Sequence, residues 1–285
     1  MIAKTELLNK KSFKSILSLT GTELVLFSVI IISTYPLVWT LLNSFKADPP
    51  RDPGFKFPAE WSFKGYKVIF TELNILGYFY NSIKIAAISV FIGLTIITLT
   101  AYVVARIDFK GKGFITLLLI STLFLPVTAT AIPTFWLVGK LGLMNTHAGI
   151  IFVYSAGISV VSFYIIRGYF LTIPKQLEES GYLDGCGFFR AFISLILPLA
   201  LPGIGTAAII SFMGYWNEFY IATLYLQDRE LMTIPALLAQ FTLVFTIDYN
   251  GLFASVIIII LLPIILFSCF SKFFIQALTA GAVKG

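Results

Sequence analysis

The polar residues with the most informative spacing lie together in one stretch, residues 173–198, between two long apolar runs. Glu178 and Glu179 come early in this stretch, where the positive end of a helix dipole favours acidic side chains. Gly185 follows Asp184, and a glycine at that point is a natural left-handed stop for a helix. The pattern predicts a short helix that lies outside the bilayer.

Small side chains on the same short helix favour a docking role. Ser180 and Gly181 would let another surface approach closely beside the acidic residues. We expect a second helix to begin with Phe188 and Phe189, and Pro198 to mark its passage into the next apolar run. A small, acidic face fits a cytoplasmic partner, although an ordinary capped turn between two spans uses the same residue types.

A second polar group follows about 30 Å farther along the same expected helix, near its outer end. It consists of Trp216, Asn217 and Glu218. Sugars bind proteins by stacking on aromatic rings and by hydrogen bonds to planar amides and carboxylates. The three residues could therefore contact a sugar or a docked binding protein. An indole that anchors the span at the membrane interface is the alternative.

Other chemistry is limited by what the apolar runs lack. They contain no acidic pair and no histidine relay, which ion-coupled carriers need near the bilayer midplane. Cys186 and Cys269 give neither a disulfide framework nor a metal cluster, and the one histidine, His147, is read as a loop residue near a membrane interface. The sequence also has no G-x-x-x-x-G-K-[ST] phosphate loop. We therefore expect no catalytic residue, no metal site and no ATP site in this chain.

The elements that must position these residues are membrane helices. The chain is 58% hydrophobic and 12% charged, and its mean hydropathy of +0.92 is too high for a soluble domain. Apolar runs of 19 or more residues, each able to cross about 30 Å of hydrocarbon as a helix, occupy 24–42, 85–105, 114–138, 148–166, 193–217 and 252–271. We expect an all-α, polytopic integral membrane protein with about six transmembrane helices.

Polar and proline residues predict where these helices begin and bend. Asn81 and Ser82 lie just before the second run and are expected to cap its helix. Pro126 and Pro133 should interrupt the third run, either as a packing adjustment or to line a translocation path. Residues 232–247 are short for a span and are read as an interfacial or re-entrant helix, with a seventh crossing as the alternative.

The basic residues indicate the orientation. With the N-terminus inside, inner segments hold 12 of the 20 Lys and Arg, and 6 of the 8 outer ones lie in the stretch 46–84. The positive-inside rule then puts both termini in the cytoplasm, and the net charge of +6 reflects topology, not nucleic-acid binding. The first run is read as a span, since no signal-peptidase site follows it. The resulting division is a single transmembrane domain over 1–285 with cytoplasmic segments 1–23, 167–192 and 272–285.

The charged stretch resembles the cytoplasmic "EAA" loop of ATP-binding-cassette importer permeases, whose pattern is roughly E-A-A-x-x-D-G-A followed by I-x-L-P. The residues that match are Glu179, Asp184, Gly185, Leu197 and Pro198. Alanines of the pattern are replaced by other small residues at Ser180, Gly181 and Cys186. This loop is typical of the wider family of importer permeases.

Further stretches resemble the sugar-importing branch of that family, in its maltose-permease G-type subunit. They are Trp216-Asn-Glu-Phe219, Thr233-Ile-Pro235 and the tail Leu278-Thr-Ala-Gly-Ala-Val-Lys-Gly285. The resemblance covers nearly the whole chain, from Asn81 to the C-terminus. It implies a permease subunit that forms half of a translocation path for a sugar or oligosaccharide, in a prokaryotic cytoplasmic (inner) membrane.

The resemblance also implies partners. A second permease subunit would complete a heterodimer, two cytoplasmic ATPases would bind ATP and Mg, and an extracytoplasmic sugar-binding protein would deliver substrate. The loop helix with Glu179, Ser180, Gly181, Asp184, Gly185 and Cys186 would seat in a cleft of one ATPase. A secondary carrier or channel without an ATPase, and a membrane enzyme, are the rival functions. Both are disfavoured, because the spans lack coupling residues and a set of acid, base and nucleophile.

Overall fold

The computed structural model describes residues 2–47, 55–157, 160–238 and 249–282. Every element in these ranges is a helix, apart from an isolated bridge between Lys46 and Trp61. Four helices are long and apolar enough to cross a membrane, and there are up to six spans if each of two bent helix pairs is one. The predicted all-α fold with about six membrane helices is therefore confirmed.

The chain forms two compact units, of which the smaller comprises Met1–Leu73 and Asp248–Ile258. It contains α1 (Ile2–Ser44), α2 (Lys64–Thr71) and the beginning of α13 (Tyr249–Ala282). The segment predicted as an N-terminal tail is thus helical from Ile2 and continuous with the first span.

Aromatic and small residues hold the smaller unit together. The rings of Trp39 and Phe253 meet edge to face with centroids 5.3 Å apart, and the hydroxyls of Ser44 and Tyr66 lie 2.9 Å apart. A Cβ at Gly65 would stand 2.3 Å from the carbonyl oxygen of Asn250, so only glycine allows α2 this close to α13.

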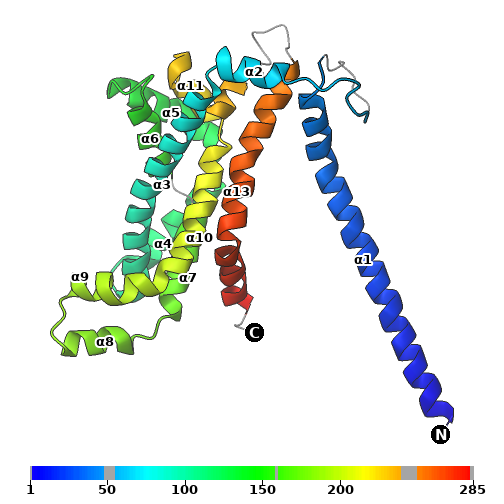
Figure 1. The fold of residues 1–285 in the computed structure, drawn as a ribbon. Helices are drawn as coiled ribbons and strands as arrows, with labels where there is room; N and C mark the ends of the chain where they lie inside the picture. Colours follow the sequence, from blue (N-terminus) through cyan, green and yellow to red (C-terminus); the bar gives the residue numbers. More distant parts are fainter. Residues whose placement is uncertain (1, 48–54, 158–159, 239–248, 283–285) are drawn as a thin grey trace. The chain divides into compact units, whose positions relative to one another are not determined.

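The larger unit, Asn74–Ile247 with Ile259–Gly285, carries the charged loop and the polar group at residues 216–218. Its centre is a bundle in which α3 (Ile75–Arg106), α7 (Val160–Thr172) and α10 (Leu197–Trp216) pack side by side (Figure 1). One apolar cluster fills this bundle. A second apolar cluster joins the start of α3 to α6 (His147–Ala156) and α11 (Tyr220–Tyr225). Two cores therefore lie along α3, one toward each of its ends.

Proline and glycine break two of the predicted spans. The third is divided into a first part, α4 (Lys112–Ser121) with η1 (Thr122–Phe124), and a second part, α5 (Val127–Lys140). The directions of the two parts differ by 105°, and Pro126 lies between them. The fourth bends by 53° between α6 and α7, just after Gly157, although no proline lies there. The break at Pro126 was predicted. The predicted interruption at Pro133 is wrong, because Pro133 lies inside the continuous helix α5. The bend after Gly157 was not predicted.

The fifth span contains a π-helical turn next to the candidate site. It begins with α9 (Phe188–Ala191), as predicted for Phe188, and continues through the π-helical turn η2 (Phe192–Ile196) into α10. The N–H of Leu197 donates to the carbonyl of Phe192, one residue farther than in an α-helix. Pro198 has no N–H to continue the regular pattern, and the helix widens immediately before it.

Candidate functional site

The charged stretch folds as a short helix, α8 (Gln176–Leu183), which lies beyond the ends of the bundle helices (Figure 1). Glu178 and Glu179 occupy its first turn, where they face the positive end of the helix dipole. The N–H groups of both residues also donate to the carbonyl of Lys175, at 3.0 and 3.1 Å. The predicted helix with an acidic start is present.

The end of α8 is a left-handed stop, as the sequence predicted. Gly185 has a φ of +81°, which an L side chain rarely adopts. The N–H of Gly185 donates to the carbonyl of Tyr182 at 3.1 Å, and the N–H of Cys186 donates to that of Gly181 at 2.9 Å. These two bonds form a Schellman motif, which turns the chain toward α9.

The two faces of α8 have different roles. Glu178 and Gly181 are buried against the same chain, whereas Leu183 is 89% exposed. A Cβ at Gly181 would stand 2.6 Å from Leu195 Cδ1, so the close surface behind this glycine is η2. Among the other predicted docking residues, Cys186 is half-buried and a free thiol, and the exposed ones are Glu179, Ser180, Asp184 and Gly185.

A buried ion pair attaches α8 to α3, and it was not predicted from the sequence. Arg106 Nε lies 3.0 Å from Glu178 Oε1, with side chains only 4% and 11% exposed. These two atoms are not aligned as a hydrogen bond, so the contact is a close ion pair. Arg106 Nη2 also donates to the carbonyl of Ile173 at 2.7 Å. Arg106 thus joins the end of α3 to the segment between α7 and α8.

An exposed ion pair near the same end of α3 contrasts with it. Lys112 Nζ donates to Asp108 Oδ1 at 2.9 Å, and the Asp108 side chain is 91% exposed. The hydrogen bond and charge of Lys112 hold the pKa of the Asp108 carboxyl below its usual range. Water screens such a pair, and its contribution to stability is small.

One turn before Arg106, an aromatic side chain fastens α3 to the other side of the loop. Tyr102 is 2% exposed, and its ring centroid lies 4.5 Å from that of Phe192 and 5.6 Å from that of Phe188. The ring of Phe170 in α7 packs on it edge to face at 5.4 Å. The last two turns of α3 therefore contact both arms of the loop that contains α8.

Just after the C-terminal end of α10, the Glu218 carboxylate accepts hydrogen bonds from its own chain. Its Oε1 accepts a hydrogen bond from the N–H of Ile221 at 2.8 Å. Its Oε2 accepts from the N–H of Ala222 at 3.0 Å and from the hydroxyl of Tyr154 at 2.5 Å. Glu218 therefore caps the start of α11 and ties it to α6.

The other two residues of the group 216–218, Trp216 and Asn217, differ in exposure. Trp216 is only 1% exposed and packs against Phe79 edge to face, with ring centroids 5.3 Å apart. Asn217 is exposed, and its Nδ2 donates to the carbonyl of Met213 at 2.9 Å. Large exposed aromatic side chains follow at Phe219 and Tyr220.

Asn81 and Ser82 hold the segment 230–234, and the prediction that they cap a helix is wrong. The helix begins at Ile75, after Asn74 in a left-handed conformation, and the apolar and aromatic residues 75–80 form its first turns, so Asn81 and Ser82 lie inside it. Asn81 Nδ2 donates to the carbonyls of Glu230 and Met232, at 2.8 and 3.1 Å. Ser82 Oγ accepts from the N–H of Ile234 at 2.9 Å.

His147 supports the same segment, 230–234. It is the first residue of α6 and not a loop residue, and its Nε2 lies 2.8 Å from the carbonyl oxygen of Leu231. The described part of the chain contains no cluster of His, Cys, Asp and Glu that could hold a metal. Of the predicted interfacial or re-entrant helix 232–247, residues 234–238 are helical and 239–247 lie outside the described residues.

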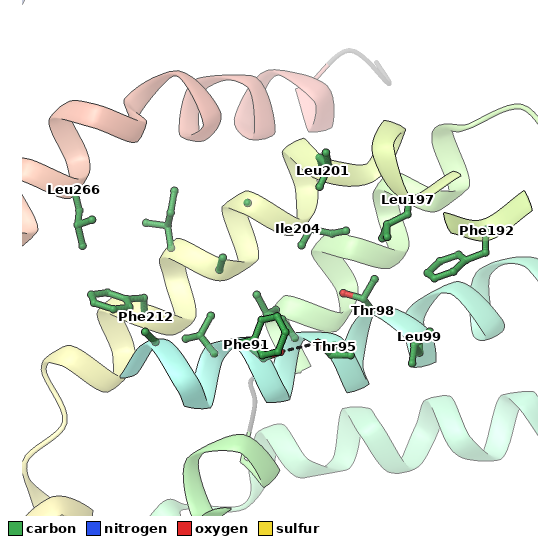
Figure 2. A pocket seen from close by; sticks show the side chains of 16 residues that line it. Phe91, Thr95, Thr98, Leu99, Phe192, Leu197, Leu201, Ile204, Phe212 and Leu266 are labelled. Atoms are coloured by element: carbon green, nitrogen blue, oxygen red, sulfur yellow. Dashed lines mark hydrogen bonds between the residues drawn. The ribbon is translucent and has the colours of Figure 1, made fainter. Parts of the chain in front are cut away.

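A groove of about 840 Å³ runs along α3, α10 and α13 (Figure 2). Its lining includes Phe91, Phe212 and Leu266, and its polar side chains are Thr95 and Thr98. The Thr95 hydroxyl donates to the carbonyl of Phe91 at 2.8 Å, so it is already satisfied. Such a wall suits lipid chains or another apolar helix, because a sugar needs several hydrogen-bonding partners.

The helices and the loop together define a class of protein, and the comparisons with known proteins name it. Residues 97–280 match the family described as binding-protein-dependent transport system inner membrane component. The chain belongs to this family, and with its membrane-spanning helices it is a multi-pass membrane protein.

Individual relatives cover nearly the whole chain. The permease protein MalG of the trehalose/maltose transport system of Thermococcus litoralis is 30% identical over 98% of this chain and 100% of its own length. The permease protein NgcG of the diacetylchitobiose uptake system of Streptomyces coelicolor is 31% identical over 86% of this chain and 82% of its own. A bacterial ABC transporter that imports the acidic polysaccharide alginate contains a chain of the same fold, with a TM-score of 0.79, 18% identity and coverage of 89% and 95%.

Proposed function

We propose that this chain is one of two membrane subunits of an ATP-driven importer and forms half of a translocation path for a sugar or oligosaccharide. The observation that carries the proposal is α8, a short helix outside the spans with an exposed face and a tightly bonded end, in a chain of this transport family. Relatives named for trehalose/maltose and diacetylchitobiose systems support a carbohydrate as the substrate.

The energy for transport would come from a cytoplasmic ATPase that docks on α8. Glu179, Ser180 and Leu183 form the face that α8 leaves exposed, and a partner could bury it. ATP and Mg bind to the two ATPase subunits in this scheme, since the sequence has no phosphate loop of its own. A second permease completes a heterodimer, and an extracytoplasmic sugar-binding protein supplies the substrate.

Docking of α8 on an ATPase requires a particular orientation in the membrane. Both termini and α8 lie in the cytoplasm, on the side that holds 12 of the 20 Lys and Arg. The segment 226–234, held by Asn81, Ser82 and His147, then lies on the outer side. A reporter fused after Gly285 should be active only in the cytoplasm, and activity outside would contradict this orientation.

The outer group would contact the sugar or the docked binding protein. Within it, the exposed amide of Asn217 and the exposed rings of Phe219 and Tyr220 offer hydrogen bonds and stacking surfaces. Trp216 and Glu218 would support this surface from behind, since one is buried and the other is bonded to its own chain.

Uptake of labelled mono- and oligosaccharides in a strain that lacks this chain tests the proposal. One or more sugars should enter wild-type cells but not the deletion strain, and a plasmid copy should restore entry. Uptake that persists when cellular ATP is depleted but the membrane potential is kept would favour a secondary carrier. Unchanged uptake of every carbohydrate in the deletion strain would contradict a sugar importer.

A further inference from the structure

The end of α3 is fastened to the α8 loop at two points, which lie one helical turn apart. Arg106 forms the buried ion pair with Glu178 and donates to the carbonyl of Ile173. Tyr102 packs on Phe188 and Phe192, on the other arm of the loop. The α8 helix also packs against η2 at Gly181, whereas the contacts of Arg106 and Tyr102 join the loop to α3 itself. These contacts therefore decide whether the loop moves with α3.

The ion pair is well suited to hold one geometry. Moving a guanidinium and a carboxylate out of water is unfavourable, and their mutual contact and the hydrogen bond from Arg106 to the Ile173 carbonyl offset this. Separating α8 from α3 without admitting water would leave two uncompensated charges. The pair therefore resists small relative movements more strongly than an exposed pair such as Asp108–Lys112, which water screens.

The N-terminal part of α3 holds the segment 230–234, which lies on the outer side in the proposed orientation. Asn81 and Ser82 bond three backbone groups between Glu230 and Ile234, and they lie about 36 Å along the helix from Arg106. A continuous helix thus carries polar attachments to α8 at one end and to an outer segment near the other. Helices transmit displacement along their axis because their internal hydrogen bonds keep the rise per residue fixed.

We propose that the Arg106–Glu178 ion pair locks α8 to α3 so that the two helices move as one rigid body when the ATPase displaces α8. Both side chains are positioning residues, which act through α3 and touch neither sugar nor nucleotide. This inference rests on the proposed function, because it requires an ATPase that docks on α8.

The test uses the complete transporter in liposomes with its binding protein and measures both sugar uptake and ATP hydrolysis per assembled complex. Glu178→Gln and Arg106→Gln should each retain the ATPase but lower sugar uptake per ATP hydrolysed by roughly tenfold, the size of a typical coupling between two sites. The double variant Arg106→Gln/Glu178→Gln should be no worse than either single variant, because neither charge is left alone. Asp108→Asn, which breaks the exposed ion pair near the same end of α3, is the matched control and should behave as wild type.

Several results would overturn the lock. Wild-type uptake per ATP in both single variants would show that the pair does not couple the helices. Effects that multiply in the double variant would show that the two residues act independently. The pair would serve folding alone if the variants gave less complex but each surviving complex coupled normally. The same conclusion would follow if none of the three variants accumulated. If the wild-type complex itself hydrolyses ATP without response to sugar, the proposed function fails and not the lock.

Discussion

Gly181 of α8 lies directly against Leu195 of η2, so that a Cβ at Gly181 would stand 2.6 Å from Leu195 Cδ1. The opposing atom is the end of a flexible side chain, and Gly181→Ala should be tolerated after Leu195 shifts, with a gain in helix propensity. Gly181→Val should push α8 away from η2 at a cost of about 1–3 kcal/mol. Co-purification of the ATPase should fall for valine and not for alanine. If Leu195→Ala restores co-purification of the ATPase in the Gly181→Val variant, the contact is confirmed. Equal co-purification with all variants would contradict it.

Gly185 tests backbone strain separately from packing. Its φ is +81°, and a Cβ there would meet nothing within 4 Å, so a side chain is opposed by conformation alone. Gly185→Val should cost about 1–2 kcal/mol locally, too little to unfold the spans but enough to tilt α8. We expect normal membrane insertion with weakened coupling of hydrolysis to sugar in liposomes. Gly185→Asn, which tolerates a left-handed backbone, is the control and should retain most coupling.

Glu218 should matter for stability more than for sugar recognition. Its carboxylate accepts hydrogen bonds from Ile221, Ala222 and Tyr154, so Glu218→Gln should weaken the cap of α11 by about 1–2 kcal/mol. Tyr154→Phe, which removes a single one of these bonds, should lower the thermal midpoint by less. Normal stability of Glu218→Gln with a large rise in the KM for uptake would instead place this carboxylate in contact with the sugar.

Asn81 offers a test of the outer attachment. Asn81→Ala should leave the carbonyls of Glu230 and Met232 without their amide partner, at a cost of about 1–3 kcal/mol. The segment 226–234 should then become more accessible to protease from the outer side, while α8 still binds the ATPase. Asn217→Ala loses only a bond to its own helix and is the matched control. Unchanged protection of the segment in the Asn81 variant would contradict the attachment.

The parts of the molecule that could be predicted are those with local causes. Glu178, Gly185 and Pro126 shape the backbone within a few residues of themselves, so their effects on α8 and on the third span follow from residue type. Long apolar runs predict spans for the same reason, because a bilayer accepts only helices of that length.

Contacts between distant segments could not be read from the sequence in this way. Arg106 looked like one more basic residue at the inner end of a span, and its partner Glu178 is 72 positions away. Asn81 looked like a helix cap, since its partners Glu230 and Met232 lie some 150 positions later. The sequence shows an acidic pair at 178–179, whose members point in different directions on a helix, but it does not show which of them is buried.

The most direct test of the central claim is ATP-driven uptake of a labelled oligosaccharide by liposomes that contain this chain, its partner permease and the ATPase, with the sugar-binding protein added outside. The complete system should accumulate sugar only with ATP inside, and Leu183→Asp on the exposed face of α8 should abolish uptake by preventing the ATPase from docking. Uptake that needs neither ATP nor the ATPase, or full activity of the Leu183→Asp complex, would contradict the account.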